Sequence, residues 1–319
     1  MPSLTKLLLA VEWATIGSGA VAATAVLIDR PHTPSPDDSE LHARSACDGG
    51  TGTKGAYRAW LDGAELPAEP TSAAPAVDEA LRQRGAKLFA THCSTCHGAR
   101  GDGKGETAAA LSIAPADLTS GVYALRTTEH EALPTDTDLF RTITRGIHGT
   151  AMPPWFALPE RDRWALVAYV KSLSKAFSED EAPPPIEAKA PAATPARIEH
   201  GRQIFASGGC ASCHGAEGRG DGLAAASLPV KPRNFTAGRF HRGSSTADIY
   251  TSIATGLDGT PMGSFAKVLG DDDLWDVAMF VHTLAPPVTD APGGLRCATA
   301  PSLPNADEEV AVRTALHSL

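Results

Sequence analysis

Apolar side chains recur at helical spacing in four short segments of the chain. Two of them, Arg163–Val170 and Leu274–Val281, place Trp and aliphatic residues three and four positions apart. The other two, Gly85–Phe89 and Gly201–Phe205, show the same spacing over fewer residues. Because this period brings the apolar residues onto one side of a helix, each segment is predicted to bury one helical face.

These segments belong to an internal repeat. Cys93–Gly98 and Cys210–Gly215 both read Cys-x-x-Cys-His-Gly, 117 residues apart, and Thr142–Met152 parallels Ser252–Met262, 110 residues apart. The difference of seven residues predicts a loop insertion around His130–Thr135 in the first half, where Pro134 disfavours regular structure. The chain is therefore predicted to contain two domains of one kind.

The N-terminal residues 1–32 contain a long apolar run. Leu7–Ile28 has Glu12 as its only ionisable side chain, and 22 residues of helix reach about 33 Å, enough to cross a bilayer. Lys6 precedes the run and Asp29 follows it, which places the bulk of the chain outside the cytoplasm. We expect a membrane anchor through residues 7–28; a cleaved signal peptide with a site near Ala20–Ala22 is the alternative.

The repeat and the composition together predict the domain boundaries. Domains over 79–177 and 196–287 are joined by a Pro- and Ala-rich linker over 178–195, whereas residues 33–78 and the tail 288–319 are expected to be irregular. The net charge of the chain is −9, but the two domains are nearly neutral. No basic field that would bind nucleic acid is present.

The cysteine motifs determine the chemistry. Cys-x-x-Cys with His directly after it is the signature of covalent c-type haem attachment. In each motif the two thiols can add to the two vinyl groups of one porphyrin, one thiol to each vinyl group: Cys93 and Cys96 in the first motif, Cys210 and Cys213 in the second. The histidine that follows, His97 or His214, then faces the iron. The sequence predicts two covalently bound haem c groups; a four-cysteine zinc site is the alternative, although it would not require the two histidines.

Each haem iron has a second axial position. Besides the start residue, the chain has three methionines, and Met152 and Met262 occupy matching places in the repeat. Pairing His with Met raises the potential of haem iron. We expect Met152 and Met262 to be the sixth ligands, with His148 as the competitor for the first haem; its counterpart in the second half is Asp258.

Over about 190 residues these motifs resemble the class I cytochrome c family, in two tandem copies. The resemblance implies an all-α fold of two tandem haem domains, to which the N-terminal transmembrane helix and irregular linkers are added. It also implies that a proline after the motif offers its carbonyl to the iron-bound histidine, and Pro115 and Pro232 each lie 18 residues after that histidine. Such a contact fixes the ring that binds the metal.

Cys47 and Cys297 lie outside both repeats. In an oxidising compartment the simplest expectation is one disulfide between the N-terminal segment and the C-terminal tail. Two free thiols are the alternative.

The sequence favours an electron-transfer protein and not an enzyme. Two haems closed by His and Met would pass single electrons between a membrane-associated donor and an acceptor on the outer, periplasmic side of the cytoplasmic membrane. The expected partners are redox proteins, in particular other subunits of a respiratory or similar complex. A dihaem peroxidase or a haem-based sensor is the alternative, and either would need one open axial position.

Overall fold

The computed structural model describes residues 53–61, 63–291 and 295–298, and this part of the chain is mainly helical. Within those residues no helix combines the length and the apolar character that a membrane crossing requires. The predicted anchor over 7–28 and Cys47 lie outside the described residues. The predicted anchor and the predicted disulfide therefore remain predictions.

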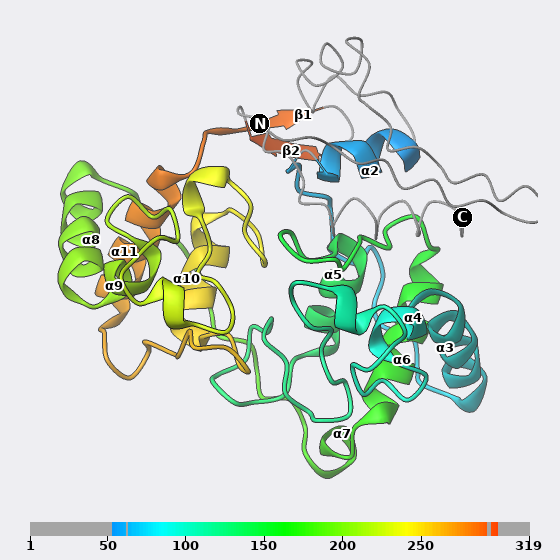
Figure 1. Ribbon diagram of the computed structural model, residues 1–319. Coiled ribbons are helices and arrows are strands. Elements are labelled where there is room, and N and C mark those ends of the chain that lie inside the picture. The colour runs from blue at the N-terminus through cyan, green and yellow to red at the C-terminus, as the bar shows by residue number, and fades with distance from the viewer. Residues whose placement is uncertain (1–52, 62, 292–294, 299–319) are drawn as a thin grey trace, which may run out of the picture. The chain divides into compact units, whose positions relative to one another are not determined.

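The first domain is built on a crossing of two long helices. Helix α3 (Glu79–His92) packs against α6 (Glu160–Leu173), as Figure 1 shows on the right. A Cβ atom at Gly85 would lie 2.0 Å from the carbonyl oxygen of Ala165, so only glycine permits this close approach. The remaining helices are α4 (Ser94–His97), η2 (Ala108–Ala110), α5 (Asp136–Arg145) and α7 (Ala176–Glu179).

Side chains at the helix starts fix where these helices begin. The Asp78 carboxylate accepts a hydrogen bond from the backbone N–H of Leu81, which opens α3. Thr135 and Asp138 form a reciprocal capping box at the start of α5. The predicted insertion is a loop that ends where α5 begins.

The second domain repeats the arrangement. Helix α8 (Pro195–Ser207) packs against α11 (Asp271–Leu284), and a Cβ atom at Gly201 would lie 1.9 Å from the carbonyl oxygen of Asp276. The glycine that opens both repeated segments in the sequence is therefore the crossing point of both helix pairs. The shorter helices are α9 (Cys210–His214), η3 (Ala225–Ser227), η4 (Phe235–Ala237) and α10 (Thr246–Thr255).

Two regions expected to be irregular contain regular structure. Helix α2 (Thr53–Leu61) lies within 33–78, and its Tyr57 and Trp60 are buried against Phe156 of the first domain. These aromatic residues are three positions apart on one face, but the helix is only nine residues long and stands among Gly and Pro. The gain from covering the first domain outweighs that weak local preference.

The tail also departs from the expectation. Strand β1 (Val288–Ala291) pairs antiparallel with β2 (Leu295–Ala298), with Thr289 opposite Cys297. β-Branched Val288 and Thr289 favour the extended backbone that such pairing needs.

The linker over 178–195 has no regular structure between residues 180 and 194, yet it contacts both domains. The backbone N–H of Ile186 donates to the carbonyl oxygen of Thr127 in the first domain at 2.7 Å. Ile186 and Ala188 also pack against the apolar core of the second domain. The linker is therefore a fixed connection between the domains.

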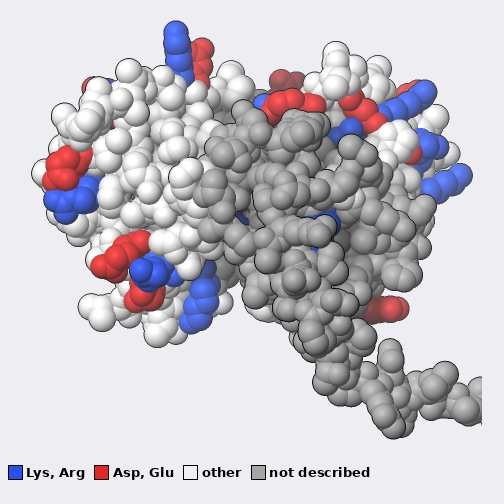
Figure 2. All heavy atoms as spheres, turned by 90° about the horizontal axis from the view of Figure 1, so that it is seen from above, with Lys and Arg blue, Asp and Glu red and all other residues white. Residues whose placement is uncertain are grey.

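Charged side chains of both signs lie close together on the face shown in Figure 2. The described part of this face therefore presents no single-sign field that would steer a highly charged partner.

Candidate haem sites

In the first domain the two motif cysteines lie on one helical turn. The N–H groups of Cys96 and His97 both donate to the carbonyl oxygen of Cys93, at 3.2 and 2.9 Å. Directly after His97, Gly98 has φ +78°, and a Cβ atom there would lie 2.4 Å from the Asp102 carboxylate. The turn places Cys93, Cys96 and His97 close together, and Gly98 allows the helix to end directly after His97.

The second motif has the same local geometry. Helix α9 carries Cys210, Cys213 and His214, and Gly215, with φ +78°, ends it. The N–H of Gly215 donates to the carbonyl oxygen of Ala211 at 2.9 Å. The structure thus brings the covalent-attachment residues of each predicted site into one turn.

Both motif histidines are oriented by a backbone carbonyl. Nδ1 of His97 lies 3.1 Å from the carbonyl oxygen of Ala116, and Nδ1 of His214 lies 3.2 Å from that of Arg233. A carbonyl can only accept, so Nδ1 carries the proton and Nε2 keeps the lone pair that a metal needs. Burial lowers the pKa of both imidazoles, while these hydrogen bonds oppose the shift.

The carbonyls that contact the histidines are not the expected ones. Pro115 and Pro232 were predicted as the acceptors, but in each domain the following residue fills that role. The carbonyl oxygens of Pro115 and Pro232 lie close to Gly103 and Gly220, where an added Cβ atom would be 2.7 and 2.5 Å from them.

The predicted methionine ligands lie in two loops of identical construction. In the first, the N–H of Ile147 donates to the carbonyl oxygen of Met152 at 3.1 Å, and the N–H of Met152 donates to Oγ1 of Thr150 at 3.1 Å. In the second, Leu257, Met262 and Thr260 make the same two bonds, at 2.8 and 3.1 Å. Each loop begins at a glycine with positive φ, Gly146 and Gly256.

A cavity of about 220 Å³ in the second domain brings its four predicted haem residues together: Cys210, Cys213, His214 and Met262 all line it. Phe235 stacks on the His214 ring at 4.5 Å between centroids. The rest of the wall is largely apolar and includes Phe205, Leu228, Val230, Phe240, Ile249, Ile253, Leu257, Phe265, Val277 and Val281. Such a wall suits a flat apolar ring.

Part of the wall also suits acidic substituents. His241 and Arg242 line the cavity, and Nε2 of His241 and Nε of Arg242 are buried without a hydrogen-bond partner among the described residues. Burial lowers the pKa of Arg242 to about 10 and that of His241 well below its usual range. Haem combines an apolar macrocycle with two carboxylates, so the cavity fits it. Sequence reasoning missed both residues because the first repeat has Ala124 and Leu125 in their place.

The competing ligand of the first site, His148, is engaged elsewhere. Its ring is buried, stacks on Trp60 at 4.7 Å between centroids, and Nε2 donates to the carbonyl oxygen of Ala64 at 3.2 Å. Burial lowers its pKa to about 3. The segment that contains helix α2 and Ala64, which the sequence did not reveal as structured, thus engages Nε2 of His148.

The zinc alternative finds no support in the described part of the chain. No group of three or more His, Cys, Asp or Glu side chains converges there as a metal site. Burial, and then the neighbouring Cys96, also raise the pKa of Cys93 to about 12, which opposes the thiolate that zinc requires.

Comparison with known protein families matches both halves. Residues 80–170 match the model of cytochrome c oxidase, cbb3-type, subunit III, and residues 198–285 match the model of cytochrome c. The chain belongs to the cytochrome c family. Its two helical domains are cytochrome c domains, which confirms the resemblance that the two Cys-x-x-Cys-His motifs predicted.

Among curated relatives, this cytochrome is similar to cbb3-type cytochrome c oxidase subunits. It is 25% identical to FixP of Sinorhizobium medicae over 226 residues, which are 68% of this chain and 65% of FixP. It is 27% identical to CcoP of Azospirillum brasilense over 205 residues, which are 63% of this chain and 61% of CcoP. The match thus spans somewhat less than two thirds of these relatives.

A solved structure is similar to this chain in sequence and fold. A chain of the reducing HAO-like protein complex of Kuenenia stuttgartiensis is 38% identical, with a TM-score of 0.63. The match covers 67% of this cytochrome and all of that chain.

Proposed function

We propose that the protein carries two haem c groups and passes single electrons between redox partners. Cys93, Cys96 and His97 would hold the first haem together with Met152. Cys210, Cys213 and His214 would hold the second together with Met262. The observation that carries this proposal is the cavity of the second domain, because all four of its predicted ligands line one apolar space.

Bound haem would supply an iron that alternates between the ferrous and ferric states, and the protein's own groups determine how that iron behaves. The carbonyls of Ala116 and Arg233 keep the proton of His97 and His214 on Nδ1, so that Nε2 would be available to bind the metal. The apolar wall excludes water and thereby favours the less charged ferrous state. A methionine ligand acts in the same direction.

We further propose that the protein works as a subunit of a membrane electron-transfer complex. Residues 7–28 would anchor it to the cytoplasmic membrane, with both haem domains on the periplasmic side. The similarity to oxidase subunits and to a chain of another protein complex supports this assignment. The donor would then be associated with the membrane, and the acceptor would lie on its outer side.

The axial ligands give the sharpest test of the site. Met152→Ala should abolish the iron–methionine charge-transfer band of the first ferric haem and lower its midpoint potential, and Met262→Ala should do the same to the second haem. Met279, which is buried in the core helix α11, gives the matched control. Met279→Leu should leave both bands in place. If Met152→Ala leaves the first haem unchanged, Met152 is not its ligand.

A further inference from the structure

The two methionine loops, Gly146–Met152 and Gly256–Met262, are alike in their internal hydrogen bonds and differ at three matching positions, of which one carries an ionisable side chain. The first carries His148 where the second carries Asp258. Both residues are nearly inaccessible to solvent: His148 is 4% exposed and the Asp258 side chain 7%. Each loop is contacted at this position by a residue of the other domain.

Arg126 of the first domain holds the second loop. Its side chain is fully buried. Its guanidinium makes a bidentate contact with the Asp258 carboxylate, with Nη2 at 3.0 Å from Oδ1 and Nη1 at 2.9 Å from Oδ2. Nη2 also donates to the carbonyl oxygen of Thr255 at 3.0 Å, at the end of the helix that leads into the loop. A bidentate arginine–carboxylate pair fixes both distance and orientation.

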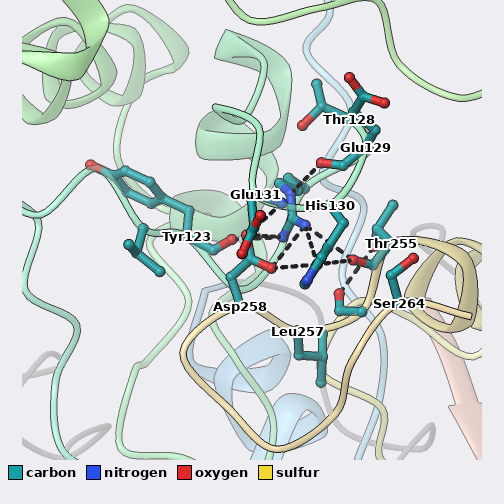
Figure 3. Close-up of polar contacts among 12 residues, drawn as sticks. Tyr123, Thr128, Glu129, His130, Glu131, Thr255, Leu257, Asp258 and Ser264 are labelled. Carbon is teal, nitrogen blue, oxygen red and sulfur yellow. Dashed lines mark hydrogen bonds and ion pairs between the residues drawn. The ribbon is translucent and has the colours of Figure 1, made fainter.

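The first domain holds Arg126 equally firmly. Nε donates to the carbonyl oxygen of Glu129 at 2.9 Å, and Nη1 donates to that of Tyr123 at 3.1 Å. Next to it, Nδ1 of His130 lies 2.9 Å from Oδ1 of Asp258, and the N–H of Glu131 donates to Oδ2 at 3.2 Å. Figure 3 shows His130 and Asp258 facing one another across this network. His130 and Glu131 belong to the loop insertion that the second repeat lacks.

The first methionine loop is held in return by the second domain. Nη2 of Arg233 donates to the carbonyl oxygen of His148 at 2.9 Å. The carbonyl oxygen of the same Arg233 accepts the hydrogen bond from His214. One residue therefore connects the motif histidine of the second site with the methionine loop of the first.

We propose that each cytochrome domain positions the axial methionine of the other, with Arg126 fixing the loop of Met262 and Arg233 fixing the loop of Met152. The inference rests on the proposed ligation by methionine. A thioether is an uncharged, weak ligand, so its bond to iron depends on a loop that holds the sulfur in place. Contact between the domains would thus keep methionine in the sixth axial position of both irons, and separation of the domains would leave that position open.

The test uses the haem-loaded full chain and two variants of the pair, Arg126→Met and Asp258→Asn. Arg84→Met is the control, because Arg84 also pairs with a buried carboxylate, Asp162, but inside the first domain. The readouts are the iron–methionine band of the ferric protein, haem by haem, and carbon monoxide binding after reduction. Covalent haem content and circular dichroism show which variants have folded.

The proposal expects Arg126→Met and Asp258→Asn each to weaken the band of the second haem and to let carbon monoxide bind there, with the first haem unchanged. Arg84→Met should leave both bands intact. Retention of the second band in both pair variants would overturn the proposal. Absence of the band from the unmodified protein would instead contradict the proposed ligation, so the two failures are distinguishable.

The reciprocal arm examines Arg233. Arg233→Met should weaken the band of the first haem, although the residue belongs to the second domain. Arg233 also lines the second cavity, so a change confined to the second haem would show a local effect only and would contradict the reciprocal arrangement.

Discussion

The two cytochrome domains agree in the turns and loops that carry the predicted haem ligands and differ in what surrounds their methionine loops. Both have the crossing glycine, the cysteine turn and the same loop hydrogen bonds. The first loop, however, is covered by Trp60 and the backbone of Ala64, whereas the second is held by an arginine–aspartate pair. Repeated residues thus supply the predicted haem ligands, and unrepeated residues form the contact between the domains.

The contacts around the two methionine loops also differ in physical character. The His148 side chain is neutral at physiological pH, stacks on an aromatic ring and makes one neutral hydrogen bond, and Arg233 reaches only the backbone carbonyl of this residue. Asp258 is a buried carboxylate, and the buried Arg126 balances its charge. Removal of one partner of a buried ion pair is more disruptive than trimming a packed contact of the same size. The second loop should therefore be the more sensitive of the two.

The largest effect should follow from removing a motif histidine. His214→Ala should eliminate the second haem and lower the unfolding midpoint by more than about 10 °C, because ligand binding stabilises only the folded domain. His97→Ala should do the same for the first domain. Haem content and a thermal melt by circular dichroism measure both effects. His200→Gln, a more exposed histidine on α8, is the control and should change neither.

Substitution of the glycine at each helix crossing should have a slightly smaller effect, and this effect should be equal in the two domains. Gly85→Ala and Gly201→Ala would each place a Cβ atom about 2 Å from a facing carbonyl oxygen, so α3 and α8 must shift. We expect each to cost about 3 kcal/mol of unfolding free energy. Gly270, where a Cβ meets nothing closer than 3.9 Å, is the control, and Gly270→Ala should cost less than about 1 kcal/mol. Equal costs at Gly270 and Gly201 would refute the close-packing explanation.

The smallest effect is the loss at low pH of the hydrogen bonds that Glu160 accepts, and it is expected in the first domain only. Glu160 accepts hydrogen bonds from Thr71 and Ser72, which lower its pKa from 4.5 to about 2. The equivalent Asp271 instead accepts from Tyr250 inside its own domain. Because the folded-state pKa is depressed, the tie to residues 71–72 is complete above pH 4.5 and is lost as pH falls towards 2.

Hydrogen exchange measures this acid effect, after correction for intrinsic rates. Protection of the Thr71 and Ser72 amides should fall between pH 4.5 and pH 2. In Glu160→Gln their protection should no longer depend on pH over that interval. Protection that stays constant in the unmodified protein would show that the Glu160 contacts do not hold this segment.

The repeat made much of this predictable. Comparing Cys93–Gly98 with Cys210–Gly215 indicated the haem chemistry, and Met152 with Met262 indicated the candidate axial ligands. Helices α6 and α11 followed from apolar spacing alone. Such features are predictable because they depend on short-range sequence patterns that occur in both repeats.

The remaining features depend on tertiary contacts that no local pattern encodes. Helix α2 forms because Trp60 and Tyr57 are buried on the first domain, and the histidine-orienting carbonyls lie one residue beyond the expected prolines. Arg126 stood in a segment with no helical period, and only the unequal offset of the repeats marked its neighbourhood as special. Departures from repeat symmetry were the available signal for the domain contact.

Carbon monoxide binding to the fully reduced, haem-loaded protein tests the central claim most directly, because the gas binds only where an axial position is open or weakly held. The account predicts no change in the visible spectrum, since Met152 and Met262 would close both irons. A shift affecting about half of the haem would contradict it, because one site would then accept an external ligand. The protein would in that case function as a dihaem peroxidase or a sensor.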